Sequence, residues 1–426
     1  MTILIILLIV LLLLIGAPLF TIIGSFSILG FSNLEIPFAV IIVELYRLAS
    51  QPVLLAIPLF TFSGYLLAES KAPNRLVALT QSLIGWLPGG LAIVVLMTCA
   101  VFTALTGGSG ITIVALGGLL YPILLSEKYQ EKFALGLITT SGSLGLLFPP
   151  SLPLILYGIV SEVSIDKLFI AGLLPGTLLI VALSIYSIRQ GLSEHVAKKP
   201  FKFSEFIKSS KAAKWELPLP IIVIGGIYNG WFTATEAAAI SAFYVFIVEV
   251  WIYKDLSLTK DIPKIMVESV VLVGAIIMIL ASAMGLTSYL IDQEVPQKLF
   301  ELVSTFISNK YLFLIILNIF LLIVGMMMDI FSAIIVVVPL IIPVAKLYGI
   351  DPIHLGIIFL TNLEIGYLTP PVGLNLFISS FRFKKSIVDI TIATVPFIIT
   401  LLISLMIITY VPELSLWLVH LIKGNP

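Results

Sequence analysis

Long apolar runs recur along the whole chain and limit what it can fold into. Five of them cover residues 168–188, 237–251, 266–290, 311–328 and 387–411. A transmembrane helix needs about 20 such residues. Apolar residues make up 60% of the 426 positions and charged residues only 11%, whereas soluble domains carry about 25% charged residues. We therefore predict an all-α polytopic membrane protein with about 11 transmembrane helices in addition to helical hairpins.

The composition excludes several functional classes. Cys99 is the single cysteine and the three histidines are scattered, so we expect neither a disulfide framework nor a zinc site. The net charge is zero and no basic stripe indicates nucleic-acid binding. The apolar runs contain no His-Glu-x-x-His, Gly-x-Ser-x-Gly or paired-aspartate motif, so we expect no enzyme, no catalytic residues and no covalently bound cofactor. The first run begins at Met1 without a basic leader or cleavage site, which predicts a retained membrane segment.

Two related halves lie on either side of a hydrophilic stretch at 189–216. The dipeptide Pro-Pro occurs at 149–150 and again at 370–371, an offset of 221 residues. Without gaps, the same offset aligns further glycines and prolines: Gly64 with Gly285, Pro122 with Pro343, Gly145 with Gly366, and Pro175 with Pro396. Agreement over so long a stretch predicts a duplicated unit, with the first repeat at 1–188 and the second at 217–426.

The charges of the loops predict that the two halves are inverted. The stretch 189–216 carries seven Lys or Arg against three acids, so it should be a cytoplasmic loop. Residues 71–75 are basic while their counterparts at 292–296 are acidic, and 161–165 carries only Glu162 while 382–386 is basic. Corresponding loops on opposite sides of the membrane are the mark of an inverted-topology repeat, a common plan of secondary transporters.

The N-terminal region leaves two arrangements open. Residues 1–30 form either one long helix or two short helices broken at Gly16-Ala17-Pro18. Residues 36–50 have an amphipathic pattern.

Four segments cannot be plain helices. Thr106-Gly107-Gly108-Ser109-Gly110 is a poor helix interior, since each glycine costs about 1 kcal/mol relative to alanine. We predict a re-entrant hairpin at about 102–122 and its counterpart, around Asp329, at about 325–347. The two Pro-Pro pairs must split the apolar runs at about 133–160 and 353–381, because proline lacks an N–H group and clashes with the preceding turn.

Hairpin tips and broken helices supply the chemistry of a binding site. Exposed N–H groups carry partial positive charge and attract a carboxylate, while exposed C=O groups carry partial negative charge. With hydroxyls and a carboxylate, such carbonyls suit a sodium ion, because hard cations prefer oxygen ligands. The candidate sodium- and substrate-binding residues at these places are Thr106, Gly107, Gly108, Ser109, Ser141, Ser143, Pro149, Pro150, Gly325, Asp329, Ser332, Asn362, Glu364, Thr369, Pro370, Gly373 and Asn375.

Structural interpretations of the same residues stay open. Asp329 is also a good helix N-cap, and an intramembrane carboxylate is a functional candidate by default. Glu364 fits equally well as a hydrogen-bonding link between helices, and the pair Gly107-Gly108 fits close helix packing. For Glu236, in Thr-Ala-Thr-Glu-Ala, we expect a packing or capping role.

Four stretches resemble the large membrane subunit of tripartite ATP-independent periplasmic (TRAP) transporters. They cover 145–158, 168–176, 233–239 and 362–377, and the last reads Asn-Leu-Glu-Ile-Gly-Tyr-Leu-Thr-Pro-Pro-Val-Gly-Leu-Asn-Leu-Phe. The resemblance extends over nearly the whole chain. It implies an elevator-type fold like that of the ion transporter superfamily. It also implies sodium-driven uptake, across the bacterial inner membrane, of a small organic anion such as a C4-dicarboxylate, sialic acid or another sugar acid.

The resemblance also implies partners and an ion site. The partners are a small four-helix membrane subunit and a periplasmic substrate-binding protein, within the lipid bilayer. The coupling sodium ions would lie near Ser109, Asp329 and Thr369, with help from neighbouring backbone carbonyls.

Two other functions compete with this interpretation. A stand-alone sodium-coupled elevator transporter for dicarboxylates shares the inverted hairpin plan. A channel or an intramembrane enzyme is the alternative from another class, and the missing catalytic motifs disfavour the enzyme.

Overall fold

The computed structural model describes residues 17–33, 37, 39–87, 89–193, 201–307 and 309–423. All regular structure in these ranges is helical, as predicted. The retained membrane segment predicted at Met1 lies outside the described residues. So does the choice between one and two helices before Pro18, although α2 (Leu19–Asn33) begins directly after that proline.

The first half contains an N-terminal group and two interrupted helix pairs. Its elements after α2 are α3 (Ala39–Ala49), η1 (Pro52–Leu55), α4 (Ala56–Glu69), α5 (Ala72–Ile84), α6 (Gly90–Thr106), α7 (Ser109–Ser126), α8 (Glu131–Ser141), η2 (Leu144–Leu147), α9 (Leu152–Ser161) and α10 (Ile165–Ser193). The stretch predicted as a basic loop contains a helix that the sequence analysis did not predict, α11 (Phe203–Ala212).

The second half begins after α11. It comprises α12 (Pro218–Tyr228), α13 (Ala234–Ile247), the π-helical turn η3 (Val248–Ile252), α14 (Asp261–Asp292), α15 (Val295–Phe306), α16 (Lys310–Met327), α17 (Ile330–Leu347), α18 (Pro352–Gly366), α19 (Leu374–Phe383), α20 (Ile387–Tyr410) and α21 (Glu413–Lys423). The five apolar runs named above are all helical here.

In the part of the chain that the structure describes, fewer helices than the predicted 11 or so are long and apolar enough to span a membrane. Among the described residues, eight helices are long and apolar enough, or nine if the bent pair formed by α8 with η2 and α9 counts as one span. The difference arises because glycine and proline shorten several apolar helices. For example, α6 has 17 residues and α18 has 15, each ending at one of the interruptions.

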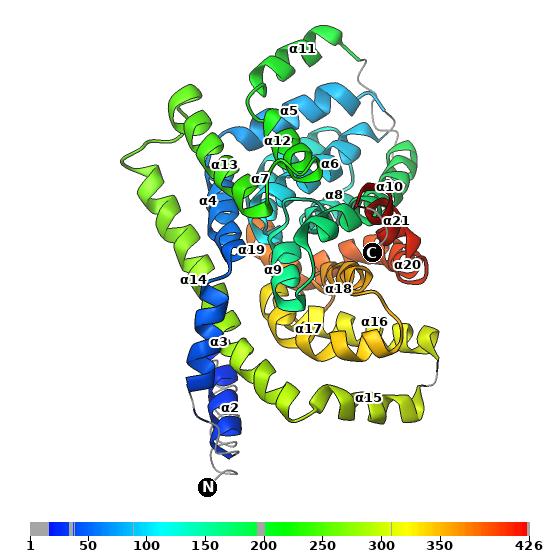
Figure 1. Cartoon of the computed structure of the whole chain (residues 1–426). Helices are drawn as coiled ribbons and strands as arrows, with labels where there is room; N and C mark the ends of the chain where they lie inside the picture. The colour runs from blue at the N-terminus through cyan, green and yellow to red at the C-terminus, as the bar shows by residue number, and fades with distance from the viewer. Residues whose placement is uncertain are drawn as a thin grey trace.

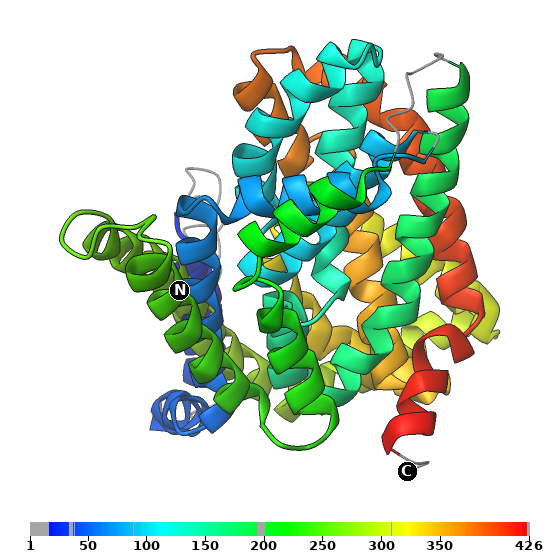
Figure 2. The same cartoon turned by 90° about the horizontal axis from the view of Figure 1, so that it is seen from above.

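Five helices form a column along one side of the molecule (Figure 1). In this column α14 packs against α2, α3 and α4, and α13 packs against α4. The interrupted helices lie together on the other side, as the second view also shows (Figure 2). The capping box at the start of α13 confirms the expectation for Glu236: its carboxylate accepts a hydrogen bond from Thr233 N at 2.8 Å, and Thr233 Oγ1 accepts one from Glu236 N at 3.2 Å.

Helix boundaries in the two halves recur at the offset of 221 residues. The first interruption falls after Thr106 and Met327, and the next helices begin at Ser109 and Ile330. The ends of α7 and α17 and the starts of α8 and α18 obey the same offset. Of the prolines paired at this offset, the two Pro-Pro pairs lie at helix breaks. The paired prolines Pro122 and Pro343, and Pro175 and Pro396, lie inside helices.

One arginine joins α5 to the elements that flank α12 and α13. Arg75 donates hydrogen bonds to Glu216, to Asp255 and, at 3.0 Å, to Glu249 Oε2. Its Cζ atom lies 3.8 Å from the centroid of the Tyr253 ring. Burial lowers the pKa of the Arg75 guanidinium, but hydrogen bonding to Asp255 and the charges of Glu216 and Glu249 raise it above its usual value. The arginine therefore stays charged and holds three segments together.

We expect Arg75→Gln to destabilise the protein strongly. The side chains of Arg75 and its three carboxylate partners are at most 13% exposed, and removing one member of a buried ion pair costs about 3–5 kcal/mol. The apparent melting temperature in detergent should fall clearly. As a control, Lys264→Gln removes the exposed pairs with Glu69 and Glu268, which contribute about 1 kcal/mol or less. Equal melting temperatures for the two variants would contradict this role of Arg75.

Candidate functional site

The chain turns between two pairs of helices near Gly107 and Asp329. The α6–α7 hairpin turns at Gly107-Gly108, where Gly107 has the left-handed backbone (φ +71°) that glycine adopts readily. The α16–α17 hairpin turns at Met328-Asp329. Their arms are longer than the predicted 102–122 and 325–347, since α6 begins at Gly90 and α16 at Lys310. In both arms the apolar helix continues from its starting point to the tip, because no proline or glycine ends it earlier.

Both Pro-Pro pairs interrupt their helices. The chain leaves helix between η2 and α9 at Pro149-Pro150, and between α18 and α19 at Pro370-Pro371. Both Pro-Pro peptide bonds are cis. Pro149 lines an apolar cavity of about 130 Å³ between α6, α10 and α12.

Each broken helix is joined by hydrogen bonds to the first arm of the hairpin in its own half. In the first half, Thr103 Oγ1 in α6 donates to Gly142 O at 2.8 Å, at the end of α8. In the second half, Met326 O in α16 accepts from Val372 N and Gly373 N, both at 3.2 Å. These bonds satisfy backbone groups that the helix breaks leave without intrahelical partners.

Glycines let the broken helices approach the hairpins closely. A Cβ atom at Gly145 would lie 2.3 Å from Ala100 O in α6. A Cβ atom at Gly366, its partner at the offset of 221, would lie 2.5 Å from Gly325 C in α16. Both distances are far inside van der Waals contact. The paired glycines therefore have the same role in the two halves: backbone packs directly on backbone.

The second arms cross between the halves. α7 packs against α19, and α17 packs against α9. Through the first of these contacts, Ser109 Oγ donates to Asn375 Oδ1 at 2.9 Å. Asn375 Nδ2 donates in turn to Thr139 O at 3.4 Å, and Asn375 N donates to Tyr367 O at 3.1 Å. Two predicted site residues, 266 positions apart, are thus brought together at the first hairpin tip.

Asp329 lies at the second hairpin tip as the N-cap of α17. Its Oδ1 atom accepts from Phe331 N and Ser332 N, both at 3.0 Å, and Oδ2 accepts from the Ser332 hydroxyl. Ile330 N donates to the Tyr367 hydroxyl, which links the tip to the second broken helix. Since the Asp329 residue is exposed and a carboxylate has about four acceptor positions, capping leaves room for a further ligand.

The structure does not join the three residues at which we placed sodium. No hydrogen bond among the described residues connects Ser109 with Asp329 or Thr369. Thr369 Oγ1 instead donates to Ile365 O near the C-terminal end of α18. The hydroxyls of Thr106, Ser141 and Ser143 likewise donate to backbone carbonyls three or four residues earlier. In the described part of the chain, no three His, Cys, Asp or Glu side chains group closely enough to hold a metal ion. Any cation here must therefore rely mainly on hydroxyl, amide and carbonyl oxygens.

The two halves of the candidate site differ in exposure. Gly107, Ser109, Ser141, Ser143 and the first Pro-Pro pair are buried. In the second half Asp329 and the second Pro-Pro pair are exposed, whereas Asn362 and Glu364, the counterparts of Ser141 and Ser143, are buried. The first hairpin tip is therefore closed by its neighbours, while the second is open.

A buried polar cluster surrounds Asn362. Asn362 Nδ2 donates to Asn318 Oδ1 at 2.7 Å, and Asn318 Nδ2 donates to Thr409 Oγ1 at 3.1 Å. Two positions along α18, Glu364 is 1% exposed, and neither carboxylate oxygen has a hydrogen-bond partner among the described residues. Asn318, Thr409 and Tyr367 were not among the predicted site residues. Tyr367 lies inside the 362–377 motif, but Asn318 and Thr409 carry no local signal.

The fold and these sites define a polytopic membrane protein whose apolar helices are interrupted at paired positions. The sequence matches the family model described as "Tripartite ATP-independent periplasmic transporter, DctM component" over residues 3–414. The chain therefore belongs to the DctM family, the large permease subunits of TRAP transporters. It is a transporter subunit and not an enzyme.

Several relatives with named functions are similar over most of this chain. The "C4-dicarboxylate TRAP transporter large permease protein DctM" of Pseudomonas aeruginosa is 37% identical, with 88% of each chain covered. The "Ectoine/5-hydroxyectoine TRAP transporter large permease protein UehC" of Ruegeria pomeroyi is 33% identical, covering 86% of this chain and 85% of the relative. The "Isethionate TRAP transporter permease protein DctMQ" of Oleidesulfovibrio alaskensis is 34% identical, covering 85% of this chain but 58% of that longer protein.

A solved structure shares the fold. The YdaH transporter of Alcanivorax borkumensis superposes with a TM-score of 0.63, covering 91% of this chain and 88% of that one. At 12% sequence identity, the likeness concerns the fold alone.

Gly366→Ala should destabilise the protein because the added methyl group meets backbone atoms of Gly325 that cannot move aside independently. Overpacking of this kind costs about 1–3 kcal/mol. The matched control is Gly274→Ala in α14, where nothing lies within 4 Å of the added Cβ, so a gain of about 0.5–1 kcal/mol is expected. Melting temperatures of the two variants in detergent should move in opposite directions. A shift of the same sign in both would refute the close-packing role of Gly366.

Glu364→Gln should remove sodium-dependent stabilisation. A buried carboxylate without a partner is costly unless a cation joins it, whereas a glutamine of the same shape needs none. The melting temperature of the wild type should be higher in sodium chloride than in potassium chloride of equal concentration, as expected by mass action for a ligand bound only to the folded state. The variant should show no difference between the two salts, while Glu69→Gln, at an exposed ion pair, should behave like the wild type. A full sodium effect in Glu364→Gln would mean that this carboxyl does not bind the ion.

Proposed function

We propose that this chain is the large permease subunit of a sodium-driven, binding-protein-dependent importer of small organic anions in the bacterial inner membrane. The observation that carries the proposal is the pairing of two hairpin tips with two broken helices, which supplies uncharged groups able to bind both an anion and sodium. Residues 106–110, 142–151, 325–332 and 366–375 contain no Lys or Arg. An anion at these places therefore depends on N–H groups and on a bound cation, which favours coupling between the two.

An inverted repeat and an elevator movement are part of the proposal. The helix boundaries that recur at one offset, and the reciprocal contacts of α7 with α19 and of α17 with α9, support two equivalent units. Since hairpins and broken helices pack backbone on backbone, they suit movement as one body. The column of α2, α3, α4, α13 and α14 is the element against which we expect that body to slide.

The substrate class is inferred from relatives and from charge. Named relatives carry C4-dicarboxylate and isethionate in their titles, both organic anions. We propose a small carboxylate or sulfonate as the substrate. The isethionate relative is a longer permease of which this chain covers 58%, and we propose that a separate small membrane subunit accompanies this chain. A soluble binding protein would deliver the anion.

The second candidate is a stand-alone sodium-coupled elevator transporter, which would have the same inverted hairpin plan. Purification of the tagged chain in mild detergent, with mass spectrometry of co-purifying proteins, separates the two. A stoichiometric small membrane protein, and uptake into proteoliposomes that requires a binding protein and a sodium gradient, support the tripartite proposal. Sodium-driven uptake by the chain alone would replace it with the stand-alone transporter, and sodium-independent uptake would overturn the sodium coupling.

Asp329→Asn should reduce sodium-driven uptake about tenfold or more, since charge-assisted contacts contribute about 1.5–3 kcal/mol. Asparagine caps helices as well as aspartate does, so expression and melting temperature should stay close to those of the wild type. Asp351→Asn is the matched control, because Asp351 caps α18 in the same way, accepting from Ile353 N at 2.7 Å. If both variants keep normal sodium dependence, Asp329 is a cap and nothing more.

A further inference from the structure

We propose that α11, together with the end of α5, forms a docking surface for the headgroup of an anionic phospholipid. The residues of this α11 surface are Trp86, Phe203, Ile207, Lys208 and Lys211. It belongs to the stretch predicted as a cytoplasmic loop, so the lipid would come from the inner leaflet. The α11 surface shares no residue with the hairpin tips or the broken helices.

The position of α11 suits contact with the surface of a bilayer. It lies at the outer rim of the molecule in Figure 1 and packs against α5 on its inner side. The helices α10 and α20, with 29 and 24 residues, are both apolar enough to span a membrane. In Figure 2, α11 crosses in front of α5 and lies across the direction of these two spans. A helix that crosses the direction of the spans lies along the plane of the bilayer.

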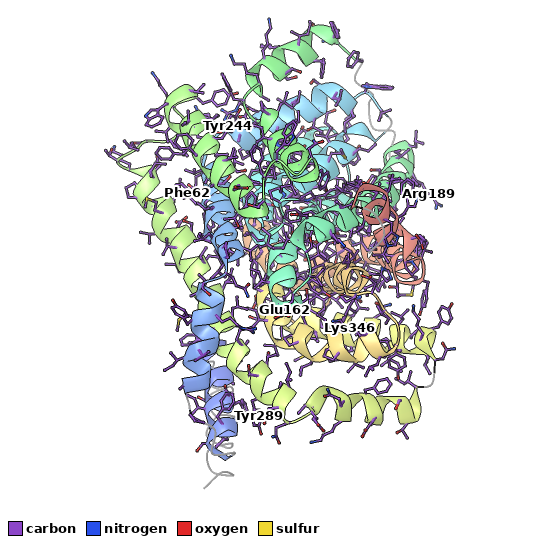
Figure 3. All side chains as sticks on the ribbon, viewed as in Figure 1. Phe62, Glu162, Arg189, Tyr244, Tyr289 and Lys346 are labelled. Carbon is purple, nitrogen blue, oxygen red and sulfur yellow. The ribbon has the colours of Figure 1, made fainter. Side chains whose placement is uncertain are left out.

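The outward side of α11 is apolar. Phe203 is 64% and Ile207 38% exposed, and their spacing of four residues places them on one side of the helix. Ser209, two positions further, is buried, and its hydroxyl lies 2.6 Å from the Ser82 hydroxyl of α5. Figure 3 shows side chains of α11 that point away from the other helices. An apolar strip held outward in this way is typical of a helix that lies in a membrane interface.

The charge of α11 favours an anionic partner. Residues 202–214 contain four lysines and one acid, Glu205, which pairs with Lys202 at 3.1 Å. Lys208 and Lys211 form no ion pair with any residue that the structure describes. They are three positions apart on one side of the helix, and Lys211 lies one turn beyond Ile207. Lysine stems can follow an apolar surface while their ammonium groups reach lipid phosphates.

A cavity of about 450 Å³ between α5 and α11 adjoins these lysines. Trp86, Phe201 and Lys208 are among its lining residues. Trp86 is 47% exposed, and its indole N–H donates to Leu83 O at 2.9 Å, which holds the ring at the end of α5. Tryptophan is enriched at the boundary between membrane and water, because its ring is apolar and its N–H group is polar. The cavity therefore offers an aromatic wall and a positive charge to one headgroup.

A fluorophore on α11 tests the proposal in the full-length chain. Position 204 is exposed and Cys99 is buried, so a polarity-sensitive thiol dye will label Ser204→Cys selectively. In detergent, dioctanoyl-phosphatidylglycerol should shift the dye emission to the blue and saturate. Dioctanoyl-phosphatidylcholine, which has no net charge, and glycerol 3-phosphate, which has no acyl chains, should bind at least tenfold more weakly.

Substitutions in the labelled chain separate charge from apolar contact. Lys208→Gln combined with Lys211→Gln should weaken phosphatidylglycerol binding tenfold or more, because each lysine near an anionic headgroup strengthens binding severalfold. Phe203→Ser should weaken it about fivefold through lost apolar contact. The matched control combines Lys128→Gln with Lys132→Gln, which removes two exposed lysines at the start of α8 with the same change in net charge. It should leave binding unchanged.

Three results would overturn the proposal. If phosphatidylcholine binds as tightly as phosphatidylglycerol, or if the two double variants behave alike, these lysines do not recognise lipid charge. If glycerol 3-phosphate shifts the dye as phosphatidylglycerol does, the cavity takes a soluble phosphate compound. If a co-purifying membrane protein shields the dye and phosphatidylglycerol has no effect, the α11 surface is a protein interface. None of these measurements involves uptake, so the proposed function can fail while this proposal stands.

Discussion

A helix that stops inside a membrane leaves N–H and C=O groups that no water can satisfy, and the arrangement of this protein follows from that constraint. At several interruptions another group of the protein supplies a missing partner. Met326 O accepts two N–H groups beyond the second Pro-Pro pair, and the Thr103 hydroxyl reaches the carbonyl at the end of α8. Asp329 caps the first N–H groups of α17. A hairpin and a broken helix therefore come as a unit, because each completes the hydrogen bonding of the other.

The same constraint explains the glycines. Backbone groups can pair across two elements only if the elements approach closely, and small residues permit this approach in membrane helices. Gly145, Gly172 and Gly366 each have backbone atoms of a neighbouring element within 2.5 Å of the position a Cβ would take. Some buried polar atoms have no hydrogen-bond partner after this packing. Among the described buried side chains they include both oxygens of Glu364 and one of Asn362. These groups are free to take a ligand that the protein itself does not supply.

Hydropathy predicted most of the helices, and the positions of glycine and proline predicted where helices are interrupted. These features could be predicted because they are local in sequence. Several helix boundaries recur in both halves at the same offset as the two Pro-Pro pairs. Contacts between distant positions were beyond such patterns. Arg75 and its carboxylate partners lie 141 to 180 residues apart, and Ser109 meets Asn375 across the two halves. Both residues of the latter pair were named as candidates, but not as partners. Sodium binding at the tips stays a prediction.

The absence of positive charge determines how an anion could be recognised at the hairpin tips and helix breaks. There an anion can use only dipoles and a bound cation, so its affinity would depend on that cation. Cations at the tips would remove this dependence, because they would hold the anion whether or not sodium had bound. The lack of lysine and arginine at those positions is therefore what makes the proposed coupling physically possible.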